Sequence, residues 1–230
     1  MRITTRISVA LLSVGLLVCF LSSAVYLLGT NASVMKALMR RTAPPEDTYL
    51  PEEDYPLAVK TITDYLTGRV EEFQFTFTMD DTEYLAFNEK EQLHMADCRV
   101  LFRLCGRIAA ASGAMVVLLF CLLLVRREQK AFSLLARVIA AEILLLIVLG
   151  VLAACFFTEA FTLFHRLLFS NNLWLLNPQT DLLVRLMPTA FFTHYALLIA
   201  AAVLLALALS AVLVQIAARS SSNHRKKELS

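Results

Sequence analysis

Two histidines lie where acid–base chemistry is possible at a membrane surface. His94 and His165 each lie beside a segment long and apolar enough to cross a bilayer, on what we expect to be the same side. Because an imidazole titrates near neutral pH, such a pair is a candidate acid–base site. Of the other two histidines, His194 lies just inside the last apolar segment, where we expect a hydrogen-bonded structural role, and His224 lies in a basic tail.

Two carboxylates accompany His94 in the sequence. Glu91, His94 and Asp97 recur every three residues, a spacing that puts them on one side of a helix. A carboxylate in either position can orient the imidazole. The spacing alone favours the plainer interpretation, an ordinary surface helix with charge pairs. Glu91 and Asp97 are therefore candidate supporting residues.

Other kinds of chemistry lack their sequence patterns. Neither the histidines and carboxylates nor the five cysteines have the tight spacing of a metal site. There is no glycine-rich phosphate loop, no nucleophile elbow and no zincin motif. No chain of polar residues runs through the apolar segments, which argues against an ion pump or a channel. We therefore expect no metal, no cofactor and no nucleic-acid partner.

Four apolar segments must position the histidines. The chain is 58% hydrophobic and only 17% charged, which is wrong for an ordinary soluble domain. Roughly 20 apolar residues cross a bilayer, and four segments satisfy this: 7–28, 108–125, 134–157 and 190–216. The first is too long for a cleaved signal peptide and is interpreted as an anchor. The expected fold class is an all-α membrane protein with four transmembrane helices.

Basic residues predict the orientation. Arginine and lysine crowd the N-terminus, the short loop 126–133 and the C-terminal tail, so these parts and both termini are expected in the cytoplasm. The two longer connections also contain basic residues, but long loops translocate largely regardless of charge. The expected organisation is 1–28 (N-terminus and first span), 29–106 (extracytoplasmic subdomain), 107–157 (second and third spans), 158–189 (extracytoplasmic interfacial loop) and 190–230 (fourth span and basic tail).

Residues 29–106 read as a small α+β subdomain, a helix plus a β-hairpin. The polar stretch that leads to Pro45 is expected to be irregular. An amphipathic helix is predicted over 54–67, with Gly68 as its stop. Three phenylalanines then alternate with polar residues before an Asp80-Asp81 turn, which predicts a hairpin. Its aromatic face needs a cover, either a helix or the lipid boundary, and the pattern does not choose. The three are Phe73, Phe75 and Phe77.

A second helix is predicted from Asn88 into the second span. Asn88 is a plausible N-cap with Glu91 three residues on. Further along, Arg99, Arg103 and Arg107 form a stripe at four-residue spacing. The stripe is either a solvated helix face or a contact with lipid phosphates, which guanidinium groups bind bidentately.

Residues 158–189 are rich in aromatic and apolar side chains and include the only tryptophan, Trp174. This composition favours interfacial helices at the membrane surface over an aqueous loop.

Two motifs resemble the lipoprotein intramolecular transacylase family of Gram-positive bacteria. One is FHRLLFSNNLW at 164–174, continued by Pro178, by DLL at 181–183, by Met187-Pro188 and by Phe191-Phe192. The other is FNEKEQLHMAD at 87–97, which is followed by Cys98-Arg99 where the family would be expected to have an aliphatic residue and often lysine. The motifs cover both long connections, and the four-span layout agrees along the chain.

The resemblance implies an enzyme that moves the sn-2 acyl chain of a diacylglyceryl lipoprotein to the α-amine of its N-terminal cysteine, giving the lyso form. His94 and His165 match the key histidines of the family. Membrane lipoproteins and phospholipid are the implied partners, the bacterial plasma membrane is the implied location with the active site on its outer face, and a monomer is expected. Further side chains expected to contact substrate or lipid headgroups are Arg99, Arg103, Arg166, Trp174 and Asp181.

In the mechanism that the resemblance implies, His94, oriented by Asp97 or Glu91, takes the proton of the amine. His165, or the histidinium formed in that step, then supplies donors to the oxyanion and the departing glycerol oxygen. The division of labour between the two stays open. Two other functions remain as alternatives: a non-enzymatic accessory or sensor protein that binds a partner through 29–106, and a lipid-ester hydrolase that uses the same histidines.

Overall fold

The computed structural model describes residues 3–126 and 129–228, with side chains up to residue 218 apart from Gln129. The side chain of His224 and the basic side chains of the C-terminal tail therefore lie outside the described part. The chain forms two compact units. The first comprises Met1–Ala24, Gly106–Leu152 and Ala200–Ser230, and the second comprises Val25–Cys105 and Ala153–Ile199.

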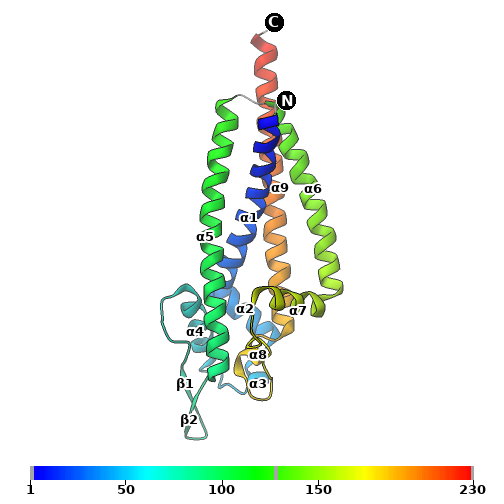
Figure 1. The fold of residues 1–230 in the computed structure, drawn as a ribbon. Helices are drawn as coiled ribbons and strands as arrows, with labels where there is room; N and C mark the ends of the chain where they lie inside the picture. The colour runs from blue at the N-terminus through cyan, green and yellow to red at the C-terminus, as the bar shows by residue number, and fades with distance from the viewer. Residues whose placement is uncertain (1–2, 127–128, 229–230) are drawn as a thin grey trace. The chain divides into compact units, whose positions relative to one another are not determined.

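Four long helices supply the first unit. They are α1 (Ile3–Gly29), α5 (Glu89–Val125), α6 (Gln129–Cys155) and α9 (Thr189–Glu228) (Figure 1). Each is long and apolar enough to cross a membrane, which confirms the four predicted spans. Most of their leucine, valine and isoleucine side chains point outward, and only 6% of the apolar window of α6 is buried. Such helices suit lipid rather than water, because a helix satisfies its own backbone hydrogen bonds.

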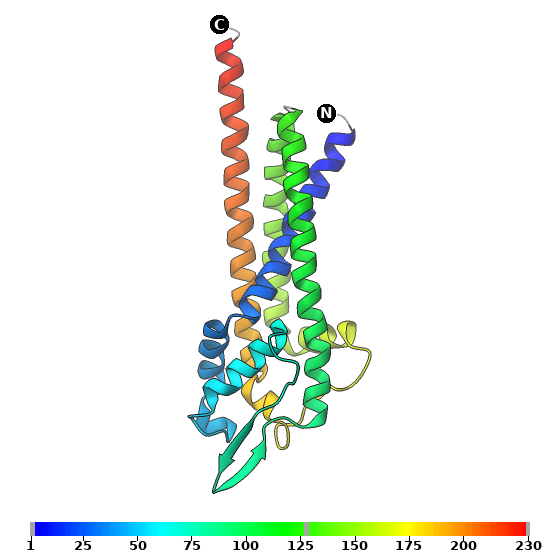
Figure 2. The same ribbon diagram turned by 90° about the vertical axis from the view of Figure 1, so that its left-hand side faces the viewer.

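The second unit contains the short elements. Its helices are α2 (Ala32–Thr42), α3 (Pro45–Thr48), α4 (Tyr55–Thr67), α7 (Phe157–Leu168) and α8 (Leu182–Leu186), together with the adjoining ends of the long helices. A single hairpin, β1 (Thr76–Met79) with β2 (Thr82–Leu85), completes it, and Figure 2 shows the two strands as a twisted ribbon. The predicted mixture of helix and hairpin is confirmed.

The expectation of an irregular stretch before Pro45 is wrong, because α2 occupies most of it. The side-chain oxygen of Asn31 accepts hydrogen bonds from the backbone N–H groups of Ser33 and Val34, at 3.0 and 3.1 Å, and so caps the helix. Its buried residues recur at helical spacing and give the helix an apolar face. They are Met35, Leu38 and Met39.

The hairpin forms as predicted, and the structure shows what covers its phenylalanine face. Asp80 and Asp81 both have positive φ, at 51° and 59°, as a two-residue turn of the primed type requires. Before the first strand, the Phe73 ring lies 5.2 Å from the ring of Tyr65 in α4 and stacks on Phe87 at 4.1 Å. The phenylalanine face is therefore covered by protein at Phe73 and Phe75, which are 2% and 9% exposed.

The two connecting segments share one hydrophobic core. Side chains of α8 and the start of α9 are buried in the same cluster as those of α2, α4 and the residues that flank the hairpin strands. Residues 29–106 and 158–189 therefore contribute to the same hydrophobic core. Members from the two segments include Tyr55, Ile62 and Phe87 on one side, and Leu183, Leu186 and Phe191 on the other.

Candidate active site

The start of α5 is fixed by a reciprocal cap. Glu91 N–H donates to Asn88 Oδ1 at 3.1 Å, and Asn88 N–H donates to Glu91 Oε2 at 2.8 Å, which confirms the predicted capping box. The other Glu91 oxygen accepts from the N–H of Leu183 in α8 at 2.6 Å. Glu91 is fully buried, so this single carboxylate joins α5 to the second connecting segment.

Three further contacts join the same helical turns to residues 171–181. Asn88 Nδ2 donates to Asp181 Oδ1 at 2.9 Å, and Asn171 Nδ2 donates to Asp97 Oδ2 at 2.9 Å. Lys90 donates to the carbonyl of Leu175. Residues 171–183 are therefore tied along the first turns of α5, which brings the segment that follows α7 beside His94.

His94 from α5 and His165 from α7 lie together in the second unit. Their ring centroids are 6.4 Å apart and the ring planes are inclined by 32°. Both side chains are buried, with 8% and 6% of their surface exposed. The expected meeting of the two histidines is therefore found in the structure.

Aromatic rings surround the pair. His165 lies 4.1 Å from the ring of Phe161 and stacks on Trp174 at 4.9 Å and on Phe169 at 5.6 Å. The centroid of the Phe169 ring also lies 5.2 Å from that of His94, so this ring is a neighbour of both imidazoles. Such walls exclude water and limit the orientations open to the imidazoles.

One hydrogen bond assigns the tautomer of neutral His165. Its Nδ1 lies 2.8 Å from the carbonyl oxygen of Phe161, and because a carbonyl only accepts, Nδ1 carries the proton. The Nε2 lone pair is then free to accept another proton. Burial lowers the pKa of His165 from its ordinary value, an effect that the bond to Phe161 partly opposes, so the ring is neutral at pH 7.

His94 is held differently from the expectation. Both Glu91 oxygens accept hydrogen bonds from backbone N–H groups, and Asp97 accepts one from Asn171. Among the described contacts, neither carboxylate forms a hydrogen bond with the imidazole. Instead, His94 Nε2 lies 3.6 Å from the sulfur of Cys98, one turn along α5. The Nδ1 atom is buried and has no hydrogen-bond partner among the described residues.

Two of the expected headgroup contacts have structural partners inside the protein. Arg99 is 7% exposed, pairs with Glu71 through two contacts of 3.2 Å and lies over the ring of Tyr65. Asp181 is 3% exposed and accepts from Asn88, Thr180 and the N–H of Asn177. Despite burial, these hydrogen bonds lower the pKa of Asp181. Both side chains therefore have partners within the protein, and their contact with a headgroup stays a prediction.

The remaining expected contacts are more accessible. Arg103 is exposed, as is Arg107, so the predicted arginine stripe divides into one buried and two exposed members. Arg166 lines a shallow groove of about 270 Å³ along α7 together with Glu159 and Thr162. Trp174 is part of the wall around His165. His194 has the expected structural role, because its Nδ1 lies 2.8 Å from the carbonyl of Ala190.

Sequence reasoning missed one residue in contact with His94 and another that links the two connecting segments. Cys98 stands four residues after His94, a helical spacing that signals contact, whereas the sequence analysis assigns this cysteine no role in the site. Asn171 lies inside the quoted motif, yet its bond to Asp97 spans 74 residues and has no local signal. Within the described ranges, no three histidine, cysteine or acidic side chains are grouped to hold a metal ion.

Fold and site together define a membrane-integral protein of four spanning helices whose connecting segments bring two histidines into contact range. The family model described as lipoprotein intramolecular transacylase Lit matches residues 10–192. The chain therefore belongs to the lipoprotein intramolecular transacylase family, and the resemblance seen in its two motifs is confirmed.

Solved structures agree on the fold. The membrane-integral lipoprotein intramolecular transacylase Lit from Bacillus cereus is 19% identical, with a TM-score of 0.73 and 99% of each chain covered. Two variants of that protein, in which one histidine is replaced by arginine or by alanine, give TM-scores of 0.71 and 0.70, at 18% and 19% identity, and cover 98% and 99% of this chain and 95% and 96% of theirs. No curated protein matches the chain.

Proposed function

We propose that this protein moves the sn-2 acyl chain of a diacylglyceryl lipoprotein to the α-amine of its N-terminal cysteine, and that His94 and His165 are its catalytic residues. The observation that carries the proposal is the buried pair itself, with ring centroids 6.4 Å apart inside an aromatic enclosure. Family membership supports the reaction class. No cofactor or energy source is needed, because an ester is exchanged for an amide within one molecule.

His165 is the general base in this proposal. Its Nδ1–H is committed to Phe161, so Nε2 offers the lone pair that takes a proton from the attacking amine. An α-amine has a pKa of about 8, so a fraction of it is neutral at pH 7 and has the lone pair needed for attack. The base then takes the proton that this nitrogen must lose as the amide forms. Among the described residues, a carbonyl acceptor selects this tautomer for His165 and none does so for His94.

His94 supplies an N–H to the reaction. The amine nitrogen attacks the ester carbonyl carbon, its proton passes to His165 Nε2, and the oxyanion that forms accepts a hydrogen bond from His94. When the carbon–oxygen bond to glycerol breaks, His165 Nε2–H returns the proton to the glycerol oxygen. The products are an amide and a free glycerol hydroxyl, and both histidines regain their starting protonation.

Positioning contributes most of the rate in this scheme. Because the amine and the ester belong to the same lipoprotein, holding the headgroup in a folded pose makes the attack effectively unimolecular. Trp174 and Phe169 wall the reacting groups from water, which protects the ester from hydrolysis. The exposed guanidinium groups of Arg103 and Arg166 are proposed contacts for lipid phosphates or substrate carbonyls.

The proposed location is the bacterial plasma membrane, with both termini in the cytoplasm and the histidine pair on the extracytoplasmic side, where lipoproteins are anchored. The basic residues of the short connections support this orientation. We propose that the protein acts as a monomer, because both histidines come from one chain and the candidate site is built without a second copy.

Tandem mass spectrometry of the N-terminal lipopeptide from a diacylated reporter lipoprotein tests the proposal. Intact mass is uninformative, since intramolecular transfer leaves it unchanged. The wild-type protein is expected to yield fragments of an N-acyl cysteine that carries a monoacylglyceryl thioether. His94→Gln and His165→Gln are expected to leave the diacylglyceryl, free-amine form, whereas His194→Gln is expected to behave as wild type.

The other outcomes identify the rival functions. A free-amine diacyl peptide with the folded wild-type protein would contradict the transfer reaction and favour an accessory or sensor role. Loss of one acyl mass would indicate a lipid-ester hydrolase, in which water takes the place of the amine. Retention of full transfer in either histidine variant would remove that residue from the catalytic pair. Size-exclusion profiles of each variant show whether lost activity reflects lost folding.

A further inference from the structure

Cys98 contacts His94, and the proposed reaction so far assigns no role to this contact. Its sulfur is 3.6 Å from His94 Nε2, within the range of a hydrogen bond to sulfur, and both residues lie on one face of α5, four residues apart. Within the described part of the chain, the sulfur has no other side-chain partner. Cys98 is also a free thiol, so it has a proton to donate.

The direction of this bond decides which nitrogen of His94 carries the proton. If Nε2–H donated to the sulfur, the acceptor would be a weak one; if the thiol donates, the acceptor is an imidazole lone pair, which is much better. The thiol is protonated near pH 7, because the ordinary pKa of cysteine is about 8.5. The favoured arrangement is therefore S–H donating to Nε2, and a neutral imidazole then carries its proton on Nδ1.

The second observation concerns that Nδ1 atom. It is buried, in a residue that is only 8% exposed, and no described residue accepts a hydrogen bond from it. Buried donors without a partner are rare in folded proteins, since each costs free energy. In the proposed reaction, a substrate oxygen that arrives with the lipid would supply the missing acceptor close to the candidate base His165.

We propose that Cys98 is a positioning residue that holds His94 in the Nδ1–H tautomer, so that Nδ1–H is the donor to the ester carbonyl oxygen of the substrate. This inference rests on the proposed function for the identity of that oxygen. The thiol itself takes no part in bond making: it keeps its proton throughout, and only the tautomer of His94 depends on it.

The tautomer is measured directly in histidine-¹⁵N-labelled protein in detergent, by long-range ¹H–¹⁵N correlation spectra that distinguish the two ring nitrogens. His165 and His194 serve as internal standards, because each has Nδ1 bonded to a carbonyl. The wild type and Cys98→Ser are expected to show His94 protonated on Nδ1, since a hydroxyl also donates. Cys98→Ala is expected to give a mixture of tautomers at His94 and unchanged spectra at the two standards.

Transfer rates supply the second readout. Cys98→Ala is expected to lower the initial rate of acyl transfer to the lipopeptide about fivefold, the size of a neutral hydrogen bond. Cys98→Ser is expected to stay within about twofold of wild type. Cys105→Ala is the matched control, because this free cysteine lies two turns further along α5 and has no hydrogen bond to a histidine among the described residues.

Four results would overturn the inference, three of them from the spectra and rates. These three are a wild-type His94 protonated on Nε2, an unchanged His94 spectrum in Cys98→Ala, and equal loss of activity in the alanine and serine variants. A hydroxylamine-sensitive acyl group on Cys98 would also overturn it, because the thiol would then be an acyl carrier. The spectra require no substrate, so they decide the tautomer even if the wild type proves inactive on lipopeptides and the proposed function fails.

Discussion

The indole ring of Trp174 stacks on the imidazole of His165, with ring centroids 4.9 Å apart and planes inclined by 29°. The indole is itself fixed, because its Nε1–H donates to the carbonyl of Asn171 at 3.1 Å. Asn171 in turn donates from its side chain to Asp97 on α5. The ring that covers the proposed base is thus anchored to the helix that carries the other histidine.

Removing this ring is expected to slow the reaction without abolishing it. Trp174→Ala should lower the rate of acyl transfer roughly fivefold to tenfold, because an aromatic pair is worth about 1 kcal/mol and its loss frees the imidazole to rotate. Trp174→Phe should retain most of the rate. Initial rates on a diacylglyceryl lipopeptide measure both. Tyr84→Ala, on the exposed hairpin, is the control for a lost aromatic ring; equal losses in Tyr84→Ala and Trp174→Ala would contradict a specific role for the stack.

The lowered pKa of His165 predicts the shape of the pH profile. As pH falls below about 8, the rate should decrease with a slope of one, because the attacking amine becomes protonated. His165 is expected to remain neutral through its ordinary pKa of 6.5, so the slope should stay at one there and steepen only at lower pH. The His94 ring, 6.4 Å away, is also neutral at these pH values, because burial, with a smaller effect from His165, lowers its pKa to about 4.

The same variant tests this assignment. Trp174→Ala opens His165 to water, which should move its pKa back towards 6.5 and bring the steeper limb into the range between pH 6 and 7. Rates at saturating and at limiting lipopeptide, measured from pH 5 to pH 9, give the two profiles. A wild-type profile with a second inflection already at pH 6.5 would show that the base is not a buried histidine.

Local signals explain what could be predicted from the sequence. The spans follow from apolar runs, the hairpin from alternation around Asp80-Asp81, and the cap of α5 from Asn88 and Glu91 three residues apart. Each of these elements is decided within a few residues. The helix α2 had such signals too, an Asn31 cap and an apolar face, but the polar stretch that leads to Pro45 suggested an irregular segment.

Contacts distant in sequence explain what was missed. The burial of Arg99 depends on Glu71, which lies 28 residues earlier, and the second partner of Glu91 is Leu183, 92 residues later. Helical spacing placed Glu91 and Asp97 beside His94, and could not show that both carboxylates bind other groups. The histidine pair itself could be anticipated, because topology put both residues at similar positions relative to their spans.

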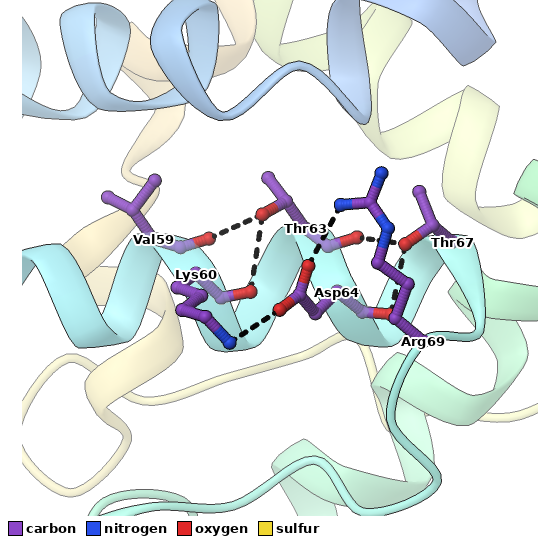
Figure 3. A network of polar contacts seen from close by, with 6 residues as sticks. All are labelled: Val59, Lys60, Thr63, Asp64, Thr67 and Arg69. Atoms are coloured by element: carbon purple, nitrogen blue, oxygen red, sulfur yellow. Dashed lines mark hydrogen bonds and ion pairs between the residues drawn. The ribbon is translucent and has the colours of Figure 1, made fainter.

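A second set of charges predicts a pH-dependent contribution to stability. Asp64 in α4 accepts from Lys60 at 2.7 Å and from Arg69 at 3.0 Å, and Figure 3 shows the carboxylate between the two cations. These hydrogen bonds lower the pKa of Asp64. The contribution is therefore complete above the unfolded pKa of about 3.8 and is lost as pH falls through the lower, folded value.

Replacing the carboxylate should expose this dependence. Asp64→Asn is expected to cost about 1 kcal/mol at pH 7, a small value because both cations are largely exposed. Thermal unfolding in detergent should show a midpoint lower by a few degrees at pH 7, and the difference from wild type should shrink towards pH 3. Glu53→Gln, an exposed carboxylate outside the network, is the control. A difference that is constant from pH 7 to pH 3 would mean that the charge is not responsible.

The proposed orientation is open to chemical labelling in intact cells. Thr82→Cys, at the exposed tip of the hairpin, should react with a membrane-impermeant maleimide added outside. Lys130→Cys, an exposed position in the first turn of α6, at the start of the third span, should react only after the membrane is permeabilised. The reverse pattern would put both termini outside and the histidine pair on the cytoplasmic face.

Glu91 should be the most sensitive carboxylate in the protein, although it is not a proposed catalytic group. Glu91→Ala removes the acceptor for two backbone N–H groups and leaves that of Leu183 buried without a partner, at a cost of about 1–3 kcal/mol per group. It also frees α8 from α5, and with it the segment that carries Trp174. We therefore expect a lower unfolding midpoint, faster proteolysis between residues 169 and 181, and loss of transfer activity together.

Two companion variants separate the bond from the charge. Glu91→Gln keeps one oxygen acceptor and should fall between wild type and Glu91→Ala in all three measurements, because its amide nitrogen cannot accept from the second N–H. Glu89→Ala removes an exposed carboxylate from the same turn of α5 and should match wild type. If Glu91→Ala lost activity while its unfolding midpoint and proteolysis pattern stayed at wild-type values, the carboxylate would have a direct part in the chemistry, and the link between the two connecting segments would not be its function.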